Sequence, residues 1–154
     1  MAIEIERKFL VKNPPLHLSE KKLSIKQGYI INDKKQVIRV RKKEKSFFLT
    51  IKGNQKGISR LEYDFPISEN DADELIIHFC NDKVIEKTRH YLRHGEHIWE
   101  IDEFHKENAG LFMAEIELKS ENESFETPDW AIKEVTSIEK YYNMNLATNP
   151  YRTW

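Results

Sequence analysis

Charged and apolar side chains alternate along Ile3-Glu4-Ile5-Glu6-Arg7-Lys8-Phe9-Leu10-Val11, close to the start of the chain. Alternate side chains of a β-strand share one face. Glu4, Glu6 and Lys8 therefore point to one side, and the apolar residues occupy the other. This pattern predicts a strand over residues 3–11 with a strongly charged face.

Seven further segments show the same period of two and are separated by turn residues such as Asn, Asp and Gly. Most of the connections are short, which favours antiparallel pairing of neighbouring strands. The seven expected strands are Lys26 to Ile31, Gln36 to Lys42, Phe47 to Lys52, Ser59 to Ile67, Lys87 to Arg93, His97 to Phe104 and Leu111 to Lys119.

Two segments carry signals for the start of a helix. Ser68 is an N-cap candidate followed by an acidic first turn, and the helix would continue toward Phe79. Thr127 to Asp129 places Pro128 at a first helical position, and the tail from Ser137 is expected to add one or two helical turns. The predicted fold class is α+β, mainly β.

Composition restricts the classes of partner. The chain has 154 residues, read as one domain over 1–154, and 25 basic and 26 acidic side chains leave a net charge of -1. No overall basic field favours nucleic acid or anionic membranes, so neither partner is expected. The single cysteine, Cys80, lies in an apolar run and is interpreted as a buried, inert thiol. No signal peptide is evident, so a cytoplasmic location is expected, and a homodimer is compatible with the sequence.

The charged faces suggest a closed barrel with a charged interior. For a single strand, a polar face turned to water explains the pattern better. Seven faces dominated by Arg, Lys, Glu and Asp weaken that explanation. Buried charges must be paired or bound to ions, so a highly charged ligand would account for such a lumen. Closed inward, the faces would gather Glu4, Glu6, Lys8, Arg39, Arg41, Lys52, Glu62, Lys87, Arg89, Glu100, Asp102, Glu115 and Glu117.

The interior divides into an acidic and a basic half. Glu4 and Glu6 on the first strand would face Glu115 and Glu117 on the last, and such an all-oxygen site suits Mg²⁺ or Mn²⁺. The lysines and arginines suit phosphate oxygens. Metal and cations together favour phosphoryl transfer on a small polyphosphate. No glycine-rich phosphate loop is present.

The ordered set of motifs resembles the CYTH superfamily, also called triphosphate tunnel metalloenzymes, over nearly the whole chain. Glu4-Ile5-Glu6-Arg7-Lys8 matches the Glu-x-Glu-x-Lys signature of that family. The other matching segments are Gln27-Gly28-Tyr29, Arg39-Val40-Arg41, Leu49 to Gly53, Glu86 to Arg89, Ala114 to Leu118, Pro128 to Trp130, Glu134 to Thr136 and Tyr141 to Asn143.

The resemblance implies an eight-stranded antiparallel tunnel with a C-terminal helix plugging one end, and hydrolysis of inorganic triphosphate. It implies catalytic roles for Lys8, Lys87, Arg89 and Asp102, with Tyr29 as a candidate that an ordinary strand aromatic would explain equally well. It implies substrate contacts from Lys8, Arg39, Arg41, Lys52, Lys87 and Arg89. Metal ligation is implied for Glu4, Glu6, Glu115 and Glu117, with Asp102 near the metals. Arg60, Glu62 and Glu100 are secondary tunnel residues, and structural ion pairs are expected for Arg60 and Glu62.

Two departures from the family pattern occur, and several functions remain open. Asp102 is followed by Glu103-Phe104-His105 rather than by Phe and Gly, and Trp130-Ala131 departs at a position expected to affect helix packing. The alternatives are an adenylate cyclase, a nucleoside or thiamine triphosphatase, and a non-catalytic polyphosphate-binding module. The two intact Glu-x-Glu pairs favour catalysis over binding alone.

Overall fold

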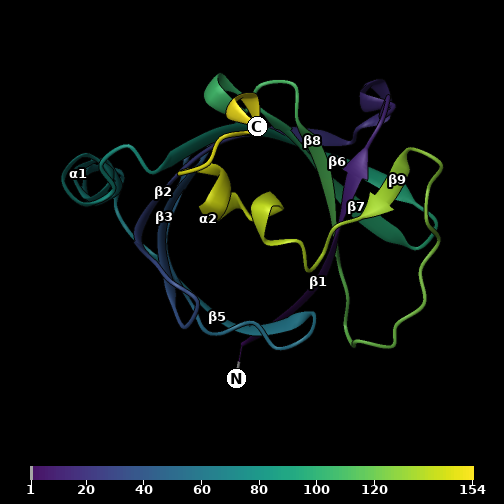
Figure 1. The fold of residues 1–154 in the computed structure, drawn as a ribbon, viewed down its shortest axis with the longest axis horizontal. Helices are drawn as coiled ribbons and strands as arrows, with labels where there is room; N and C mark the ends of the chain where they lie inside the picture. Colours follow the sequence, from purple (N-terminus) through teal and green to yellow (C-terminus); the bar gives the residue numbers. More distant parts are fainter. Residues whose placement is uncertain (1) are drawn as a thin grey trace.

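A computed structural model describes residues 2–154 and shows eight strands closed into an antiparallel barrel (Figure 1). Around the barrel the strands follow the order β1, β8, β7, β6, β2, β3, β4 and β5, and β5 pairs with β1 to close the ring. The predicted closed eight-stranded barrel is confirmed. The strands are β1 (Ile3–Val11), β2 (Lys21–Asn32), β3 (Val37–Lys43), β4 (Ser46–Lys52), β5 (Ser59–Pro66), β6 (Val84–His94), β7 (His97–Phe104) and β8 (Phe112–Glu117).

The strand bounds differ from the prediction mainly at β2 and β6. Both strands begin earlier than expected, at Lys21 and Val84. The start of β2 pairs with the end of β6, where Lys21 lies opposite Tyr91. Backbone pairing along this long ladder extends β2 through Lys21 and Lys22, where side-chain alternation gives no signal.

Helix α1 (Glu69–Phe79) begins where the sequence predicts. The Ser68 side chain accepts a hydrogen bond from the Asp71 backbone nitrogen at 3.0 Å. The helix packs on the outside of β2, β3 and β4. Gly28 is required there, because a Cβ atom would lie 2.6 Å from the sulfur of Cys80. Cys80 is fully buried, as expected.

The helix expected at Thr127 to Asp129 is wrong. The chain forms a ninth strand instead, β9 (Ala131–Glu134), which pairs antiparallel with the end of β1. Pro128 starts a turn rather than a helix, because its carbonyl accepts a hydrogen bond from the Ala131 nitrogen at 3.0 Å. The Trp130 departure therefore affects no helix. Its ring packs edge-on against Trp99, with 5.5 Å between the ring centroids.

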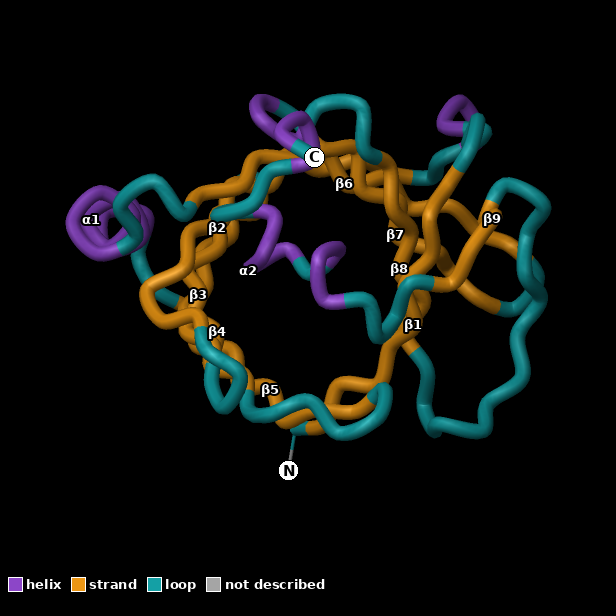
Figure 2. Tube along the Cα trace, in the orientation of Figure 1, coloured by secondary structure: helices purple, strands orange, loops and turns teal. Residues whose placement is uncertain are grey.

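The C-terminal tail plugs one end of the barrel, as the resemblance implies. Helix α2 (Asn143–Leu146) and the 3₁₀ turn before it lie inside the barrel outline, seen down the axis (Figures 1 and 2). Leu146 and Val135 pack with Phe104 and Met113 in one apolar cluster. None of the helices in residues 2–154 is long and apolar enough to cross a membrane. Four 3₁₀ turns complete the described chain, at Leu16–Leu18, Lys106–Asn108, Glu139–Tyr141 and Tyr151–Thr153.

Candidate active site

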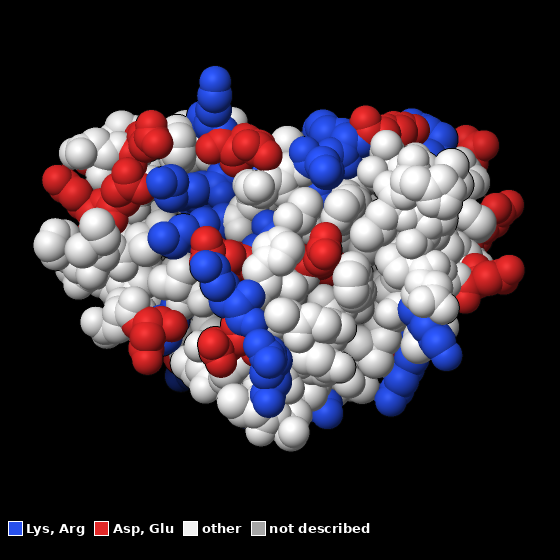
Figure 3. Space-filling view, turned by 90° about the horizontal axis from the view of Figure 1, so that it is seen from above, with Lys and Arg blue, Asp and Glu red and all other residues white. Residues whose placement is uncertain are grey.

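The inward faces enclose a charged cavity of about 280 Å³. Figure 3, seen at right angles to the view of Figure 1, shows Lys and Arg side chains gathered beside Asp and Glu on the outer surface as well. Every predicted site residue except Asp102 contributes to the lining. These residues are Glu4, Glu6, Lys8, Tyr29, Arg39, Arg41, Lys52, Arg60, Glu62, Lys87, Arg89, Glu100, Glu115 and Glu117.

The acidic half of the cavity is built by pairing of β1 with β8. Glu6 lies opposite Glu117, and Lys8 lies opposite Glu115. Cross-strand partners share a face, so the two Glu-x-Glu pairs meet on one wall. The predicted contact between the first strand and the last strand of the barrel is therefore present.

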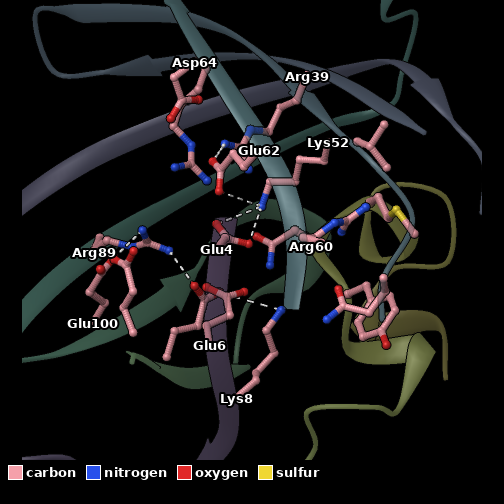
Figure 4. A pocket seen from close by; sticks show the side chains of 18 of the residues that line it. Glu4, Glu6, Lys8, Arg39, Lys52, Arg60, Glu62, Asp64, Arg89 and Glu100 are labelled. Carbon is pink, nitrogen blue, oxygen red and sulfur yellow. Dashed lines mark hydrogen bonds and ion pairs between the residues drawn. The ribbon is translucent and has the colours of Figure 1, made fainter. Parts of the chain in front are cut away.

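A second group of charges forms where β5 closes the ring. Lys52 Nζ lies 3.0 Å from Glu4 Oε1 and 3.8 Å from Glu62 Oε2, while Arg39 Nη2 lies 3.7 Å from Glu62 Oε1 (Figure 4). Glu62 thus contacts two cations on the neighbouring strands β3 and β4. Arg60 behaves differently, because its guanidinium donates two hydrogen bonds to the Gly53 carbonyl, at 3.1 and 2.7 Å.

Glu4 and Glu62 share one proton at neutral pH. Burial, together with the neighbouring Glu4, raises the pKa of Glu62 to about 8. Burial also acts to raise the pKa of Glu4, but Lys52 and a hydrogen bond from Glu62 lower it to about 2. Glu62 is therefore the protonated member of the pair.

This proton predicts a pH dependence of stability in metal-free protein. The pKa of Glu62 is higher in the folded chain than its ordinary value of 4.5, so its contribution to stability is complete below pH 4.5 and is lost as pH rises through about 8. Glutamine at position 62 cannot ionise. The free energy of unfolding of wild type minus that of Glu62→Gln is expected to fall across this window in urea titrations with chelator. Parallel pH profiles for the two proteins would contradict the assignment.

Glu115 is neutralised by cations, whereas Glu6 is not. Lys8 Nζ lies 3.6 Å and Arg89 Nη2 3.5 Å from Glu115. Although burial opposes it, these cations hold the pKa of Glu115 well below its usual range. Burial raises the pKa of Glu6 well above its usual range, and Glu115 and Glu4 raise it further. Among residues 2–154, no Lys, Arg or His nitrogen lies within 4 Å of a Glu6 oxygen.

Asp102 lies behind the cavity wall, between two cations. Its side chain is 1% exposed, and its oxygens accept hydrogen bonds from Lys87 Nζ at 2.6 Å and from Arg89 Nε and Nη2 at 2.8 and 2.9 Å. Burial lowers the pKa of Lys87 to about 7, even though Asp102 acts to raise it. Both Asp102 oxygens are thus used to hold Lys87 and Arg89.

The carboxylate wall has the chemistry of a divalent cation site, although its side chains do not already converge on one. In the described chain no three carboxylate, histidine or cysteine groups are arranged as a metal site. Glu4 is instead ion-paired with Lys52, and Glu115 is ion-paired with Lys8 and Arg89. Glu6 and its cross-strand partner Glu117 have pKa values raised by burial and neighbouring carboxylates. A cation would relieve that repulsion, so the residues fit a hard divalent metal.

Within residues 2–154, the basic half contains donors with no acidic partner. Arg39 Nε is buried without a hydrogen-bond partner. Arg41 Nε donates to the neutral Gln27 side chain at 2.9 Å, and burial with the nearby Arg39 and Arg89 lowers the pKa of Arg41 to about 10. Buried cations in this state are relieved by an anion, so this half is suited to phosphate oxygens.

Sequence reasoning missed several residues of the site. Lys43 and Asp64 line the cavity. The alternation places Asp64 on the face of Arg60 and Glu62, although it was not chosen as a site residue, and Lys43 continues the alternation of Arg39 and Arg41 one residue beyond the predicted strand. Tyr142, Asn143 and Met144 reach the cavity from the plug, and no local pattern marks them. Tyr29 is 2% exposed, belongs to the apolar cluster below the plug, and its hydroxyl accepts a hydrogen bond from Gln27 at 2.7 Å.

Comparison with known proteins agrees with this geometry. The model of the CYTH domain matches residues 2–149. The chain belongs to the CYTH family. CYTH triphosphate tunnel metalloenzymes use divalent metals. A relative from Acetivibrio thermocellus, named inorganic triphosphatase, is 44% identical over 154 residues, which is 100% of this chain and 99% of the relative.

Solved structures share this fold. The crystal structure of the inorganic triphosphatase NE1496 has a TM-score of 0.69 and 31% sequence identity, covering 96% of this chain and 95% of that one. The PH1012 protein from Pyrococcus horikoshii has a TM-score of 0.61 at 20% identity, covering 77% and 80% of the two chains. At 20% identity, the similarity to the PH1012 protein supports the fold alone.

Proposed function

We propose that this CYTH domain hydrolyses inorganic triphosphate to pyrophosphate and phosphate inside the barrel. The observation that carries the proposal is a group of cationic donors that face a wall of glutamates in one cavity. Arg41 Nε is bonded only to a neutral amide, and the buried Arg39 Nε has no hydrogen-bond partner among residues 2–154. The name of the 44% identical relative supports the same activity.

The basic residues bind and orient the triphosphate. Arg39, Arg41 and Lys52 offer charged donors that exchange their weak internal partners for phosphate oxygens. Lys87 and Arg89 are fixed by Asp102, so they meet the substrate without reorganising. Lys8 extends from the acidic wall and neutralises charge that develops on the phosphate released.

The glutamate wall would hold the metal. Glu4, Glu6, Glu115 and Glu117 are the proposed ligands, and Mg²⁺ or Mn²⁺ are the proposed ions because all four donors are carboxylate oxygens. A divalent cation held there supplies Lewis-acid activation of a water molecule and neutralises phosphate charge. Asp102 is proposed to orient the cations Lys87 and Arg89 rather than to contact the metal directly.

Phosphate release from inorganic triphosphate, ATP and thiamine triphosphate tests the proposal, each with Mg²⁺, with Mn²⁺ and with chelator. Fast release from inorganic triphosphate that stops with chelator is the expected result. Preferential turnover of ATP would replace the proposal, with cyclic AMP identifying a cyclase and ADP a nucleotidase. Release from none of the three, together with tight triphosphate binding, would identify a binding module instead.

A further inference from the structure

The plug contributes one polar side chain that holds the cations of the tunnel. Asn143, the first residue of α2, accepts hydrogen bonds at its Oδ1 atom from Lys87 Nζ at 2.9 Å and from Gln27 Nε2 at 3.2 Å. Gln27 is fully buried, and its Oε1 atom accepts the bond from Arg41 Nε. A continuous chain of hydrogen bonds therefore joins the plug to two cations on different strands.

The acceptors in this chain of hydrogen bonds are neutral amides, which suits a site that must bind an anion. A carboxylate at position 143 would neutralise Lys87 and compete with phosphate. Asp102 already pairs with Lys87, and a neutral amide satisfies a further hydrogen of the ammonium without adding a second negative charge. Gln27 does the same for Arg41. Because both acceptors are amides, the cations stay ordered and remain attractive to phosphate.

We propose that Asn143 is a positioning residue, which orients Lys87 directly and Arg41 through Gln27 for contact with the phosphates. This inference rests on the proposed triphosphatase function. The plug would then have two tasks, closing the barrel end and aligning the basic half of the site.

The test compares two variants that each remove one hydrogen bond between the plug and the barrel wall. Asn143→Ala is expected to lower kcat/KM for triphosphate by about 10–100-fold, the range typical of residues that orient a direct ligand. Asn32→Ala is the matched control, because its Nδ2 atom donates to the Met144 carbonyl at 2.9 Å and anchors the same helix without contacting the cations. The control is expected to show a similar drop in melting temperature but little loss of kcat/KM. If both variants lose the same amount of kcat/KM, Asn143 only anchors the plug and the inference is wrong.

A double-mutant cycle separates coupling from general damage. If Asn143 acts on Arg41 through Gln27, then Asn143→Ala combined with Gln27→Ala should cost clearly less than the product of the two single effects. If the two single effects on kcat/KM multiply in the double variant, Asn143 does not act through Gln27 and the inference is wrong. Triphosphate affinity, measured by calorimetry in the same variants, tests the inference even if wild type proves to lack hydrolysis. An absence of turnover in wild type contradicts only the proposed function.

A separate inference concerns the outer wall of the barrel. Helix α1 covers β2 to β4, and Phe125 and Trp130, from the segment leading into β9, pack against β1 and β7. Among residues 2–154, no helix or loop covers the outer face of β5 in this way. Leu61, Tyr63 and Phe65 alternate along it and are 39%, 42% and 48% exposed. By register, the exposed Ile3 lies opposite Leu61 and the exposed Ile51 opposite Tyr63.

We infer that this outer wall, defined by Ile3, Ile51, Leu61, Tyr63 and Phe65, pairs with the same wall of a second copy of the chain. None of the five side chains is charged, so a two-fold contact between copies would bury apolar surface on both sides without burying a charge. Together they expose on the order of 400 Å² of apolar surface, enough for the core of a two-fold interface of about 800 Å² per partner. Contacts across β5 leave the inward-facing Glu62 untouched.

Sedimentation velocity over a concentration series tests this surface. Wild type is expected to be dimeric, and Tyr63→Lys monomeric with its triphosphatase activity per chain retained. Ile77→Lys is the control, since Ile77 is 70% exposed on α1, outside the proposed wall, and the variant should remain dimeric. Wild type that is monomeric up to about 100 µM, or a dimer that survives Tyr63→Lys, would overturn the inference.

Discussion

Replacing Glu6 with glutamine is expected to lower triphosphate hydrolysis by more than about 100-fold while the barrel stays folded. Residues that only support a metal ligand typically cost up to about 100-fold when they are replaced, and the loss of a ligand itself should cost more. Glu6 has no cation within ion-pair distance among the described residues, and its neighbours Glu4 and Glu115 raise its pKa. Its carboxylate is therefore placed to bind a cation rather than to stabilise the empty fold. Removing it takes away a metal ligand and a source of repulsion together.

Two measurements check the Glu6→Gln prediction. Phosphate release is measured over a titration of Mg²⁺ or Mn²⁺, and melting temperature is measured with metal and with chelator. In chelator, the melting temperature of Glu6→Gln should equal or exceed that of wild type. Added metal should raise the melting temperature of the variant less than that of wild type. Glu103→Gln is the control, because Glu103 faces outward beside Asp102 and contacts His90. Wild-type turnover in Glu6→Gln would contradict the metal assignment.

Replacing Asp102 with asparagine is expected to destabilise the protein by about 3–5 kcal/mol, the usual cost of removing one partner from a buried ion pair. Asp102 is 1% exposed and is the shared acceptor for Lys87 and Arg89. Without its charge, two neighbouring cations remain buried and repel each other. Activity should fall as well, because both cations lose the group that orients them.

Urea unfolding of the Asp102→Asn protein gives the stability change, and an exposed pair supplies the comparison. Arg7 and Glu134 lie 3.1 Å apart at the barrel surface, with their side chains 30% and 38% exposed. Glu134→Gln is therefore expected to cost less than about 1 kcal/mol. If the two substitutions cost the same, Asp102 does not hold the cations as the geometry indicates.

Much of the site could be predicted from local alternation. Because alternate residues of a strand share a face, Glu4, Glu6 and Lys8 could be placed together from their spacing alone. The same parity placed Arg39 with Arg41 and Lys87 with Arg89. It missed Lys43 only because the predicted strand ended one residue too early.

The ninth strand shows where local signals failed. Pro128 is compatible with both a helix start and a turn, and the exposed edge of β1 decided between them. Backbone groups of Phe9, Leu10 and Val11 offered pairing partners that no pattern near residue 128 reveals. The alternatives were settled by a strand more than a hundred residues away.

The sequence by itself determined the barrel, the charged lumen and the side chains that face it, because strand periodicity is a property of neighbouring residues. Only the tertiary structure decided which charges meet. Lys52 reaches Glu4 because β5 closes the ring on β1, Asp102 is enclosed by Lys87 and Arg89, and Asn143 enters from the plug. These contacts depend on strand register and on the path of the tail, which bring distant segments together and leave no local pattern.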